Sequence, residues 1–343
     1  MDFRSDNTSG AAPEIMAALA KANHGTASSY GDDDWSRELD TVFSSLFDTE
    51  CRVFPVATGT AANSLALSAL SPGHGAIYCH QDSHIVVDEC NAPEFFTGGA
   101  KLVTLPGEAG KIDLRALKAA ATAGWSGVQH HPQPKAISIT QATEYGTVYS
   151  ADEIADIAAI GRAEGLHLYM DGARFANAVA GMNCHPADLT WRAGVDVLGF
   201  GATKNGAMAA EAVIFFKPEL AEGFLFRRKR AGHLFSKARF LSAQLLAMVQ
   251  DGLWLRLARE ANARARELAE GLQRIPGISV PFPVQANEVF AVLPEAMVAK
   301  LKQRGALFHV WDPARSLYRF VCAFDKRPED VAQLLKAAEE AAG

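Results

Sequence analysis

From residue 52 onward, short apolar runs alternate with amphipathic or alanine-rich stretches, and this alternation constrains the fold more than any other feature. The intervening stretches have helical spacing. Strands that are apolar on both sides and separated by helices form a mostly parallel sheet that helices cover on both faces. We therefore predict an α/β architecture. Its strands are expected at RVFPV, AIYC, KLVTL, KAISIT, LHLYM, VDVLGF and EAVIFF.

The pattern changes after about residue 217, where a long helical region begins and runs to Pro276 and Gly277. Beyond it, short strands and helices follow in an order typical of a small α+β domain. We predict an N-terminal arm and large α/β domain over residues 1–255 and a small C-terminal domain over residues 256–343. The first fifty residues should be helical, with Pro13 at an early helical position.

Composition argues against several classes of function. The formal charge is -6 and the one basic cluster is short, RRKR at 227–230, so we expect no nucleic-acid partner. No apolar run approaches the roughly 18 residues that span a bilayer, and the start lacks a signal-peptide pattern, so we expect neither membrane nor export. Five cysteines without a CxxC pair favour packing roles in a reducing cytoplasm.

A metal site is not expected either. His80, His84 and Cys90 lie close in sequence. However, neither HExxH nor paired CxxC spacing accompanies them, and a zinc site needs such a ligand pattern.

The first informative strand end follows RVFPV, where Thr58, Gly59 and Thr60 lead into a helix. Ligands of open α/β sheets bind at the carboxyl ends of the strands. Free N–H groups at a helix N-terminus, with glycine allowing close approach, form a phosphate-binding cup. The segment is neither a Walker A motif nor a GxGxxG fingerprint. An ordinary threonine-capped helix is the alternative interpretation.

Two further strand ends present charged side chains. Asp171 follows LHLYM, where a carboxylate is costly unless it is paired or bound to something. It could form a structural salt bridge, for example with Arg174, or it could neutralise a cationic ring nitrogen. Lys204 follows VDVLGF inside GFGATKNG, whose small residues leave room for a flat cofactor. A desolvated lysine forms Schiff bases with carbonyl compounds, whereas a surface lysine in a glycine turn would be inert.

Taken together, these three features match the phosphate, the ring nitrogen and the aldehyde of pyridoxal 5'-phosphate (PLP). A fourth strand end, after AIYC, supplies His84. Beside a pyridine ring this histidine could stack on the ring face and move protons near neutral pH. A hydrogen-bonded loop histidine is the alternative.

At these residues the chain resembles the L-threonine aldolases, PLP enzymes of fold type I that are related to the β-eliminating lyases. The resemblance covers essentially the full length. It rests on FRSDNTSG, SSYGDDD, ATGTAAN, DSHIVVDECNAPEFF, YMDGARFANA, GATKNG and LYRFVCAF. It implies the PLP-dependent transferase-like fold with a mostly parallel central sheet, helices on both faces and a small C-terminal α+β domain.

The resemblance also implies roles for individual residues. Lys204 would bond to the cofactor aldehyde, Asp171 would pair with the ring nitrogen and His84 would stack on the ring. The phosphate and the rest of the cofactor would contact Gly59, Thr60 and Thr203. The amino acid substrate would be bound by Ser5, Tyr30, Arg174 and Arg319, since arginine suits a carboxylate through its bidentate fork. Glu89 follows the histidine segment without an assigned role.

One segment departs from the family pattern. Family members carry an arginine after the basic helix that reaches the phosphate in a neighbouring subunit's site, whereas this chain has RKRAGHLFSKARF there. Lys237, or else Ser236, stands where that arginine is expected, and Lys237 is our candidate for the phosphate contact. The resemblance implies a homotetramer, a dimer of dimers with sites at the dimer interface.

We therefore predict PLP-dependent retro-aldol cleavage of L-3-hydroxy-α-amino acids to glycine and an aldehyde. The substrates would include L-threonine, L-allo-threonine and phenylserine. The nearest alternative keeps the cofactor but carries out β-elimination, racemisation or transamination. A nucleotide-binding α/β module and an inert interaction protein are alternatives from other classes, and the absent nucleotide fingerprints count against the first.

Overall fold

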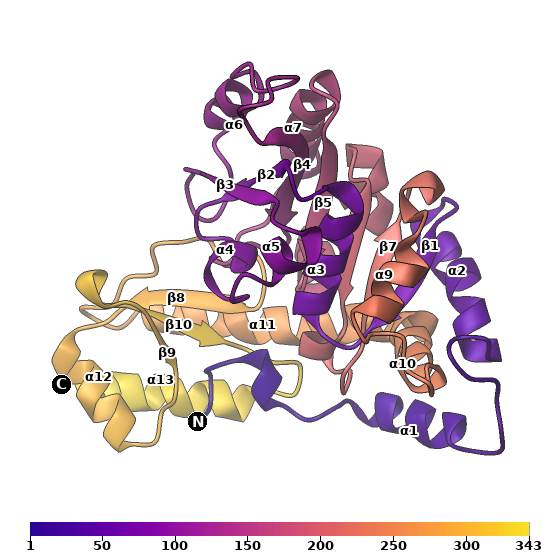
Figure 1. Cartoon of the computed structure of the whole chain (residues 1–343). Coiled ribbons are helices and arrows are strands. Elements are labelled where there is room, and N and C mark those ends of the chain that lie inside the picture. Colours follow the sequence, from indigo (N-terminus) through magenta and orange to yellow (C-terminus); the bar gives the residue numbers. More distant parts are fainter. Residues whose placement is uncertain (343) are drawn as a thin grey trace.

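The computed structural model describes residues 1–342, which form one large and one small sheet with their helices (Figure 1). The large sheet contains β1 (Arg52–Val56), β2 (Gly75–His80), β3 (Lys101–Leu105), β4 (Gln133–Thr140), β5 (His167–Gly172), β6 (Val197–Gly201) and β7 (Glu211–Phe215). The small sheet contains β8 (Glu288–Val292), β9 (His309–Asp312) and β10 (Leu317–Val321).

The α-helices of the described residues alternate with these strands. They are α1 (Pro13–Ala22), α2 (Asp34–Phe47), α3 (Gly59–Leu70), α4 (His84–Val87), α5 (Ala92–Thr97), α6 (Leu114–Ala121), α7 (Ala151–Ala163), α8 (Phe175–Met182), α9 (Phe224–Arg230), α10 (Arg239–Val249), α11 (Leu253–Gln273), α12 (Glu295–Gln303) and α13 (Pro328–Ala342). The predicted helical start is confirmed, and Pro13 is the first residue of α1.

The large sheet has the strand order β1-β7-β6-β5-β4-β2-β3. Neighbours from β6 through β3 run parallel, whereas β7 is antiparallel to both β6 and β1. The prediction of a mostly parallel sheet is therefore confirmed. Because β4, β5 and β6 run the same way, the residues that follow them lie at one edge of the sheet.

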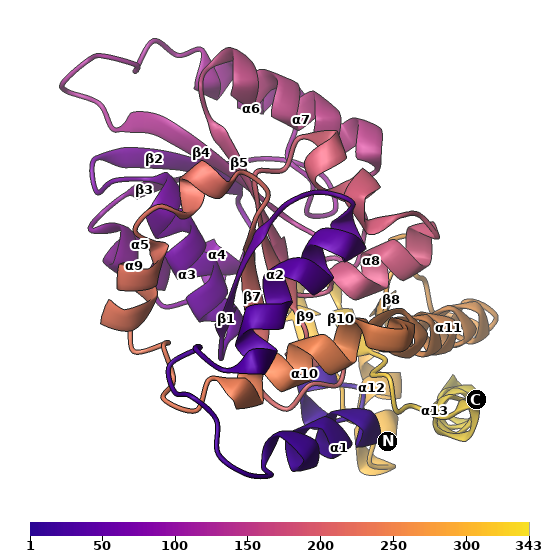
Figure 2. The same cartoon turned by 90° about the vertical axis from the view of Figure 1, so that its right-hand side faces the viewer.

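Helices cover both faces of this sheet, as Figure 2 shows. On one face α3 and α9 pack in a core with Ile77 and Cys79 of β2, while Tyr78 points to the core of the other face, which α2, α7, α8 and α10 cover. Alternation of side chains along a strand places neighbours on opposite faces. Nearly every residue of α3 after Thr60 is buried, and its alanine-rich sequence allows this close packing.

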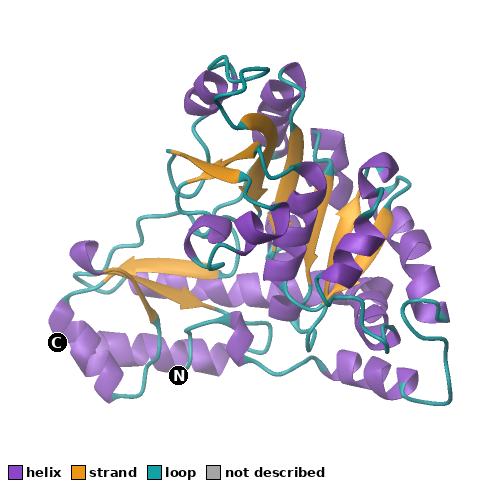
Figure 3. Cartoon of the chain, viewed as in Figure 1, coloured by secondary structure: helices purple, strands orange, loops and turns teal. Residues whose placement is uncertain are grey.

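The small sheet is antiparallel, in the order β8-β10-β9, and α11, α12 and α13 flank it (Figure 3). The N-terminal arm joins this part of the chain. Phe3 is buried in its core, accepts a hydrogen bond from the N–H of Val321 at 2.8 Å and donates one to the carbonyl of Leu307 at 2.8 Å. These contacts carry the residues after Phe3 toward the carboxyl edge of the large sheet.

The predicted helical region after residue 217 is confirmed, and it is divided into separate helices. Three helices, α9, α10 and α11, occupy it. The first break contains Gly232 with a φ angle of 77°, and the second contains Asp251 and Gly252 with φ angles of 54° and 67°. Positive φ angles of this kind suit glycine. The predicted end is confirmed, since α11 stops at Gln273, just before Pro276. The domain boundary at residue 255 falls in the first turn of α11 and stays a prediction.

Two observations bear on the wider setting of the chain. Within residues 1–342, no helix combines the length and the apolar character needed to cross a membrane. All five cysteines are free thiols, three of them buried: Cys51, Cys79 and Cys322.

Candidate active site

A cavity of about 300 Å³ opens at the carboxyl edge of the large sheet. Most of the predicted site residues line it: Gly59, Thr60, His84, Asp171, Arg174, Thr203 and Lys204. They come from β1–α3, β2–α4, β5–α8 and the segment after β6. Predicted residues from four separate strand ends are therefore brought together.

The N-terminus of α3 forms one wall of the cavity. Thr58 is its N-cap, and Thr58 Oγ1 accepts a hydrogen bond from the N–H of Ala61 at 3.2 Å. The N–H groups of Gly59 and Thr60 precede the first intrahelical donor, the N–H of Ala62, so they remain available to a ligand. A Cβ added at Gly59 would meet no atom within 4 Å, which shows that the backbone faces open space. This wall can hold an anion.

Asp171, at the end of β5, is 6% exposed. Asp171 Oδ2 accepts a hydrogen bond from Asn63 Nδ2 at 2.9 Å, and Oδ1 accepts one from the N–H of Ala173 at 2.9 Å. Its alternative interpretation, a salt bridge with Arg174, is not what the structure shows, because Arg174 pairs with Asp6 and Glu288. Among residues 1–342 Asp171 has no cationic partner, which leaves its charge for a ligand.

Asn63 links Asp171 to a second buried carboxylate. Its Nδ2 also donates to Glu89 Oε1 at 2.6 Å, and its Oδ1 accepts from Tyr169 Oη at 2.6 Å. His84 Nδ1 lies 2.9 Å from the same Glu89 oxygen. This hydrogen bond raises the pKa of His84 against the opposing effect of burial, while burial raises the pKa of Glu89. With Nδ1 bound to Glu89, Nε2 is the imidazole nitrogen that remains for a ligand.

Lys204 lies in a 3-10 turn after β6, between Thr203 and Asn205. The glycines before it have a packing role that the sequence did not predict. A Cβ at Gly199 would lie 2.4 Å from Tyr169 Oη, and a Cβ at Gly201 would lie 2.5 Å from the carbonyl oxygen of Ala173. Gly199 and Gly201 therefore allow close packing of β6 against the β5 region, in addition to lining the cavity.

Glu211 supports the lysine turn from the antiparallel strand β7. Its Oε2 accepts a hydrogen bond from the N–H of Ala202 at 2.8 Å. Burial raises the pKa of this carboxyl to about 7, against the lowering effect of Thr203, Ala202 and the Lys204 charge. The site thus holds a carboxyl group that changes charge near neutral pH.

A second such group, Glu144, lies on the opposite wall. Its Oε1 accepts hydrogen bonds from the N–H of His84 and from Thr140 Oγ1, both at 2.8 Å. Burial raises the pKa of Glu144 to about 7. This carboxyl therefore ties the backbone of His84 to the end of β4.

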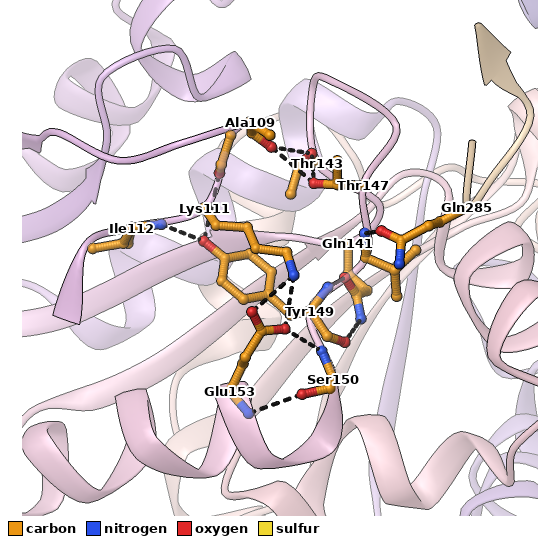
Figure 4. A network of polar contacts seen from close by, with 12 residues as sticks. Ala109, Lys111, Ile112, Gln141, Thr143, Thr147, Tyr149, Ser150, Glu153 and Gln285 are labelled. Carbon is orange, nitrogen blue, oxygen red and sulfur yellow. Dashed lines mark hydrogen bonds and ion pairs between the residues drawn. The ribbon is translucent and has the colours of Figure 1, made fainter. Parts of the chain in front are cut away.

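A polar network fixes the loop that carries Glu144 (Figure 4). Gln141 Nε2 donates to the carbonyl of Tyr149 at 2.9 Å, and the N–H of Tyr149 donates back to Gln141 Oε1 at 3.0 Å. Gln285 Oε1 accepts from the N–H of Val148 at 2.8 Å, which joins the loop to the segment before β8. These hydrogen bonds therefore fix the loop 141–149, whose Glu144 accepts from the N–H of His84.

The predicted carboxylate-binding residues are only partly in the cavity. Arg174 lines it, whereas Arg319 lies behind, next to Arg174 and Glu288. Ser5 Oγ accepts from the N–H of Asn7, and it is Asn7 that reaches the cavity.

Two other predicted residues, Tyr30 and Lys237, lie outside the cavity. The N–H of Tyr30 donates to the carbonyl of Ser236 at 3.0 Å, and the Lys229 ammonium lies 4.7 Å from the Tyr30 ring centroid. Lys237 and Ser236 line a separate hollow with Phe235. Tyr30 therefore lies next to the segment of Ser236 and Lys237, and none of these three residues lines the cavity of its own chain.

Comparison with known proteins decides the family. The family model for beta-eliminating lyases matches residues 2–296. The low specificity L-threonine aldolase of Pseudomonas aeruginosa is 46% identical over 334 residues, which covers 97% of this chain and 96% of the relative. The chain belongs to the beta-eliminating lyase family. The predicted resemblance is confirmed, and the activity is that of an L-threonine aldolase, an aldehyde-lyase that cleaves threonine by a retro-aldol reaction.

Solved structures agree with this membership. A threonine aldolase from Leishmania major superposes with a TM-score of 0.93 at 27% identity and covers 100% of this chain and 99% of its own. An SPT structure with PLP superposes at 0.71 with 16% identity, covers 99% of this chain and 87% of its own, and so shares the fold alone. The fold is that of the fold type I PLP enzymes, as predicted.

The cavity fits the cofactor that the family implies. The backbone of Gly59 is open to the cavity, the buried Asp171 lacks a cation among the described residues, and the Lys204 amine shares the same space. These features suit a phosphate, a protonated ring nitrogen and an aldehyde.

Sequence reasoning missed several polar residues of the site: Asp6, Asn63, Glu144, Glu211 and Glu288. Two of them had a signal. An asparagine four residues into the alanine-rich stretch after Gly59 is one helical turn from the N-terminus, and a glutamate heads the apolar run EAVIFF. Asp6 and Glu288 left no comparable signal, because their charged partners are distant in sequence. Glu144 contacts the nearby Thr140, but its contact with His84 spans 60 residues.

Proposed function

We propose that PLP binds in this cavity and that Lys204 bonds to its aldehyde. Asp171 would hold the ring nitrogen protonated, and the N–H groups of Gly59 and Thr60 would bind the phosphate, with Thr203 beside the lysine. The observation that carries the proposal is the convergence of these groups, from three separate strand ends, on one cavity. When bound, the cofactor would supply an aldehyde for the substrate amine and a ring that withdraws electrons from the neighbouring carbon.

The chain's own groups would orient the substrate. Asp6 occupies Nε and Nη2 of Arg174 at 2.8 Å and 3.2 Å. Nη1 lies 3.4 Å from Glu288 Oε1 without a hydrogen bond, and it would donate to the substrate carboxylate. Arg319 would complete the carboxylate site, with Ser5 near it. Fixing the carboxylate sets the direction of the Cα–Cβ bond, and this orientation selects the bond that breaks.

His84 would take the proton of the β-hydroxyl group, directly or through a water molecule. The hydrogen bond with Glu89 holds a proton on Nδ1 and raises the pKa of the imidazole, so Nε2 is the basic nitrogen. As the proton moves to Nε2, the C–O bond becomes the aldehyde C=O and the Cα–Cβ bond breaks, leaving its electron pair at Cα. Protonation of Cα then gives glycine. A general base whose pKa lies near the working pH suits this step.

We further propose that L-allo-threonine and phenylserine are cleaved in the same way as L-threonine. The groups assigned above contact the amino, carboxylate and β-hydroxyl parts that all three share. β-Elimination, racemisation or transamination would leave the β-carbon attached or release ammonia, so product analysis separates these reactions from aldol cleavage.

The chain is also proposed to form a homotetramer, a dimer of dimers, in the cytoplasm. Tyr30 is 51% exposed, and Phe226 is 78% exposed on α9, the helix whose Lys229 contacts the Tyr30 ring. Exposed aromatic side chains are typical of interfaces. Lys237 would reach the phosphate in the site of a second copy, and Tyr30 would contact substrate there.

Replacing Lys204 with alanine tests the proposed function. The variant should lose nearly all conversion of L-threonine to glycine and acetaldehyde, measured by product detection, and should lose the visible absorption of the bound cofactor. Lys118→Ala, on the exposed side of α6, is the matched control and should behave as the wild type. Full activity in Lys204→Ala would contradict the assignment.

A further inference from the structure

Four charged side chains, three of them buried and Arg319 half-buried, meet beside the cavity. Asp6 comes from the N-terminal arm, Arg174 from the start of α8, Glu288 from the start of β8 and Arg319 from β10. The Arg174 guanidinium lies 2.8 Å from Asp6 and 3.4 Å from Glu288, and Arg319 lies 3.5 Å from Glu288. Of these four side chains Arg174 alone lines the cavity, so the cluster meets a ligand there through Arg174.

Asp6 accepts two hydrogen bonds from Arg174, whereas Glu288 contacts both arginines without a hydrogen bond. The Glu288 side chain is fully buried, and neither of its oxygens has a hydrogen-bond partner among residues 1–342. The same oxygen, Oε1, is the nearest to both guanidiniums. Because hydrogen bonds are missing, the charge of Glu288 is its main contribution to the cluster.

The position of Glu288 is fixed by the backbone around it. Glu288 is paired with Val321 across the small sheet. A Cβ added at Gly146 would lie 3.0 Å from Glu288 Cβ, so the loop after β4 closes against it. The backbone and the Cβ of Glu288 are therefore held between the small sheet and this loop, with the carboxyl group next to both arginines.

The net charge of the four side chains determines how they interact with a carboxylate ligand. Two guanidiniums face two carboxylates, so the cluster is neutral before any ligand is bound. A substrate carboxylate would add a third negative charge. Its attraction to Arg174 and Arg319 is thus opposed by repulsion from Glu288, which acts strongly because the site is buried.

We propose that Glu288 is a positioning residue that sets the affinity of the carboxylate site: it holds the two arginines together while limiting their attraction for the carboxylates of substrate and of glycine. This inference rests on the proposed function, in which the arginines bind the substrate carboxylate. This role would explain why a buried carboxylate without hydrogen bonds lies beside the two arginines. A lower affinity for glycine would allow the product to dissociate.

Glu288→Gln in the full-length protein with its cofactor tests the inference, because glutamine keeps the shape and removes the charge. The dissociation constant of glycine, measured by titration calorimetry, should fall on the order of tenfold, together with the KM for L-threonine. Glu295→Gln, an exposed charge on the neighbouring helix α12, is the control and should leave both constants unchanged. Unchanged or increased constants in Glu288→Gln would overturn the inference.

Two further measurements keep the result unambiguous. In the wild type, aminomethylphosphonate, which carries more negative charge than glycine, should bind more weakly than glycine; equal or tighter binding would overturn the inference even if Glu288→Gln did not fold. Arg319→Gln should weaken glycine binding. If it does so while Glu288→Gln does not tighten binding, only this inference fails, and if Arg319→Gln has no effect, the proposed role of Arg319 fails as well.

Discussion

Glu211 makes the stability of the chain depend on pH in a way that can be worked out from the structure. Its side chain is buried beside the Lys204 turn, with the N–H of Ala202 donating to Oε2. Burial raises its pKa from the ordinary value of 4.5 to about 7. Between these two values the unfolded chain releases the proton while the folded chain keeps it.

The sign and size follow from linkage. A carboxyl whose pKa is raised by folding contributes stability that is fully present below pH 4.5 and is lost as the pH rises through about 7. Each pH unit in this window lowers the free energy of unfolding by about 1.4 kcal/mol. The total loss attributable to Glu211 is therefore about 3 kcal/mol.

Glu211→Gln removes the titration and keeps the acceptor for Ala202. Urea unfolding of the cofactor-free chains at several pH values from 4.5 to 8 should show the variant gaining on the wild type by about 3 kcal/mol across the range, with little change above pH 8. Glu339→Gln, an exposed glutamate of α13, should show a constant difference from the wild type. A pH-independent difference for Glu211→Gln would refute the reasoning.

Three other substitutions test the site. Asp171→Ala should weaken PLP binding in equilibrium titrations and slow turnover, and wild-type kinetics would mark a structural carboxylate. His84→Ala should retain the cofactor spectrum but lose aldol cleavage by a factor of about 100 or more, typical of a lost general base; a wild-type rate would remove it from the mechanism. Asp6→Asn should lower the free energy of unfolding in urea by about 3 to 5 kcal/mol, because it leaves the buried Arg174 without its bidentate carboxylate partner. A decrease below about 1 kcal/mol, which is typical of an exposed ion pair, would contradict this prediction.

The sheet and the cavity were predictable because their signals are local in sequence. Apolar runs mark the strands, and the parallel order carries their ends to one edge. Asp171 and Lys204 follow two such apolar runs, and the turn at Gly59 follows a third, so these residues were found without knowledge of any contact.

The partners of those residues were not predictable in the same way. Asn63 contacts Asp171 across 108 residues of chain, and Asp6 contacts Arg174 across 168. Such pairs depend on how α3 and the N-terminal arm pack, which no local pattern records. The glycines at 199 and 201 were noticed, but their packing against Tyr169 and Ala173 depends on the register of β5 and β6.

The helical region after residue 217 shows a different limit. Two short breaks divide it, one over residues 231–238 with Gly232 and one over residues 250–252 with Gly252. Glycine inside a helical pattern is tolerated at a modest cost, so the pattern alone does not decide between a continuous helix and a turn. At Gly232 and Gly252 the positive φ angle decides for a turn.

The central claim is that Lys204 carries the cofactor of this threonine aldolase. Borohydride reduction of the purified, cofactor-loaded protein fixes a lysine–aldehyde bond permanently, and peptide mass spectrometry then locates the modified lysine. The account predicts a single pyridoxyl group on the peptide containing Lys204. A pyridoxyl group on another lysine, or no modification of a fully active protein, would contradict it.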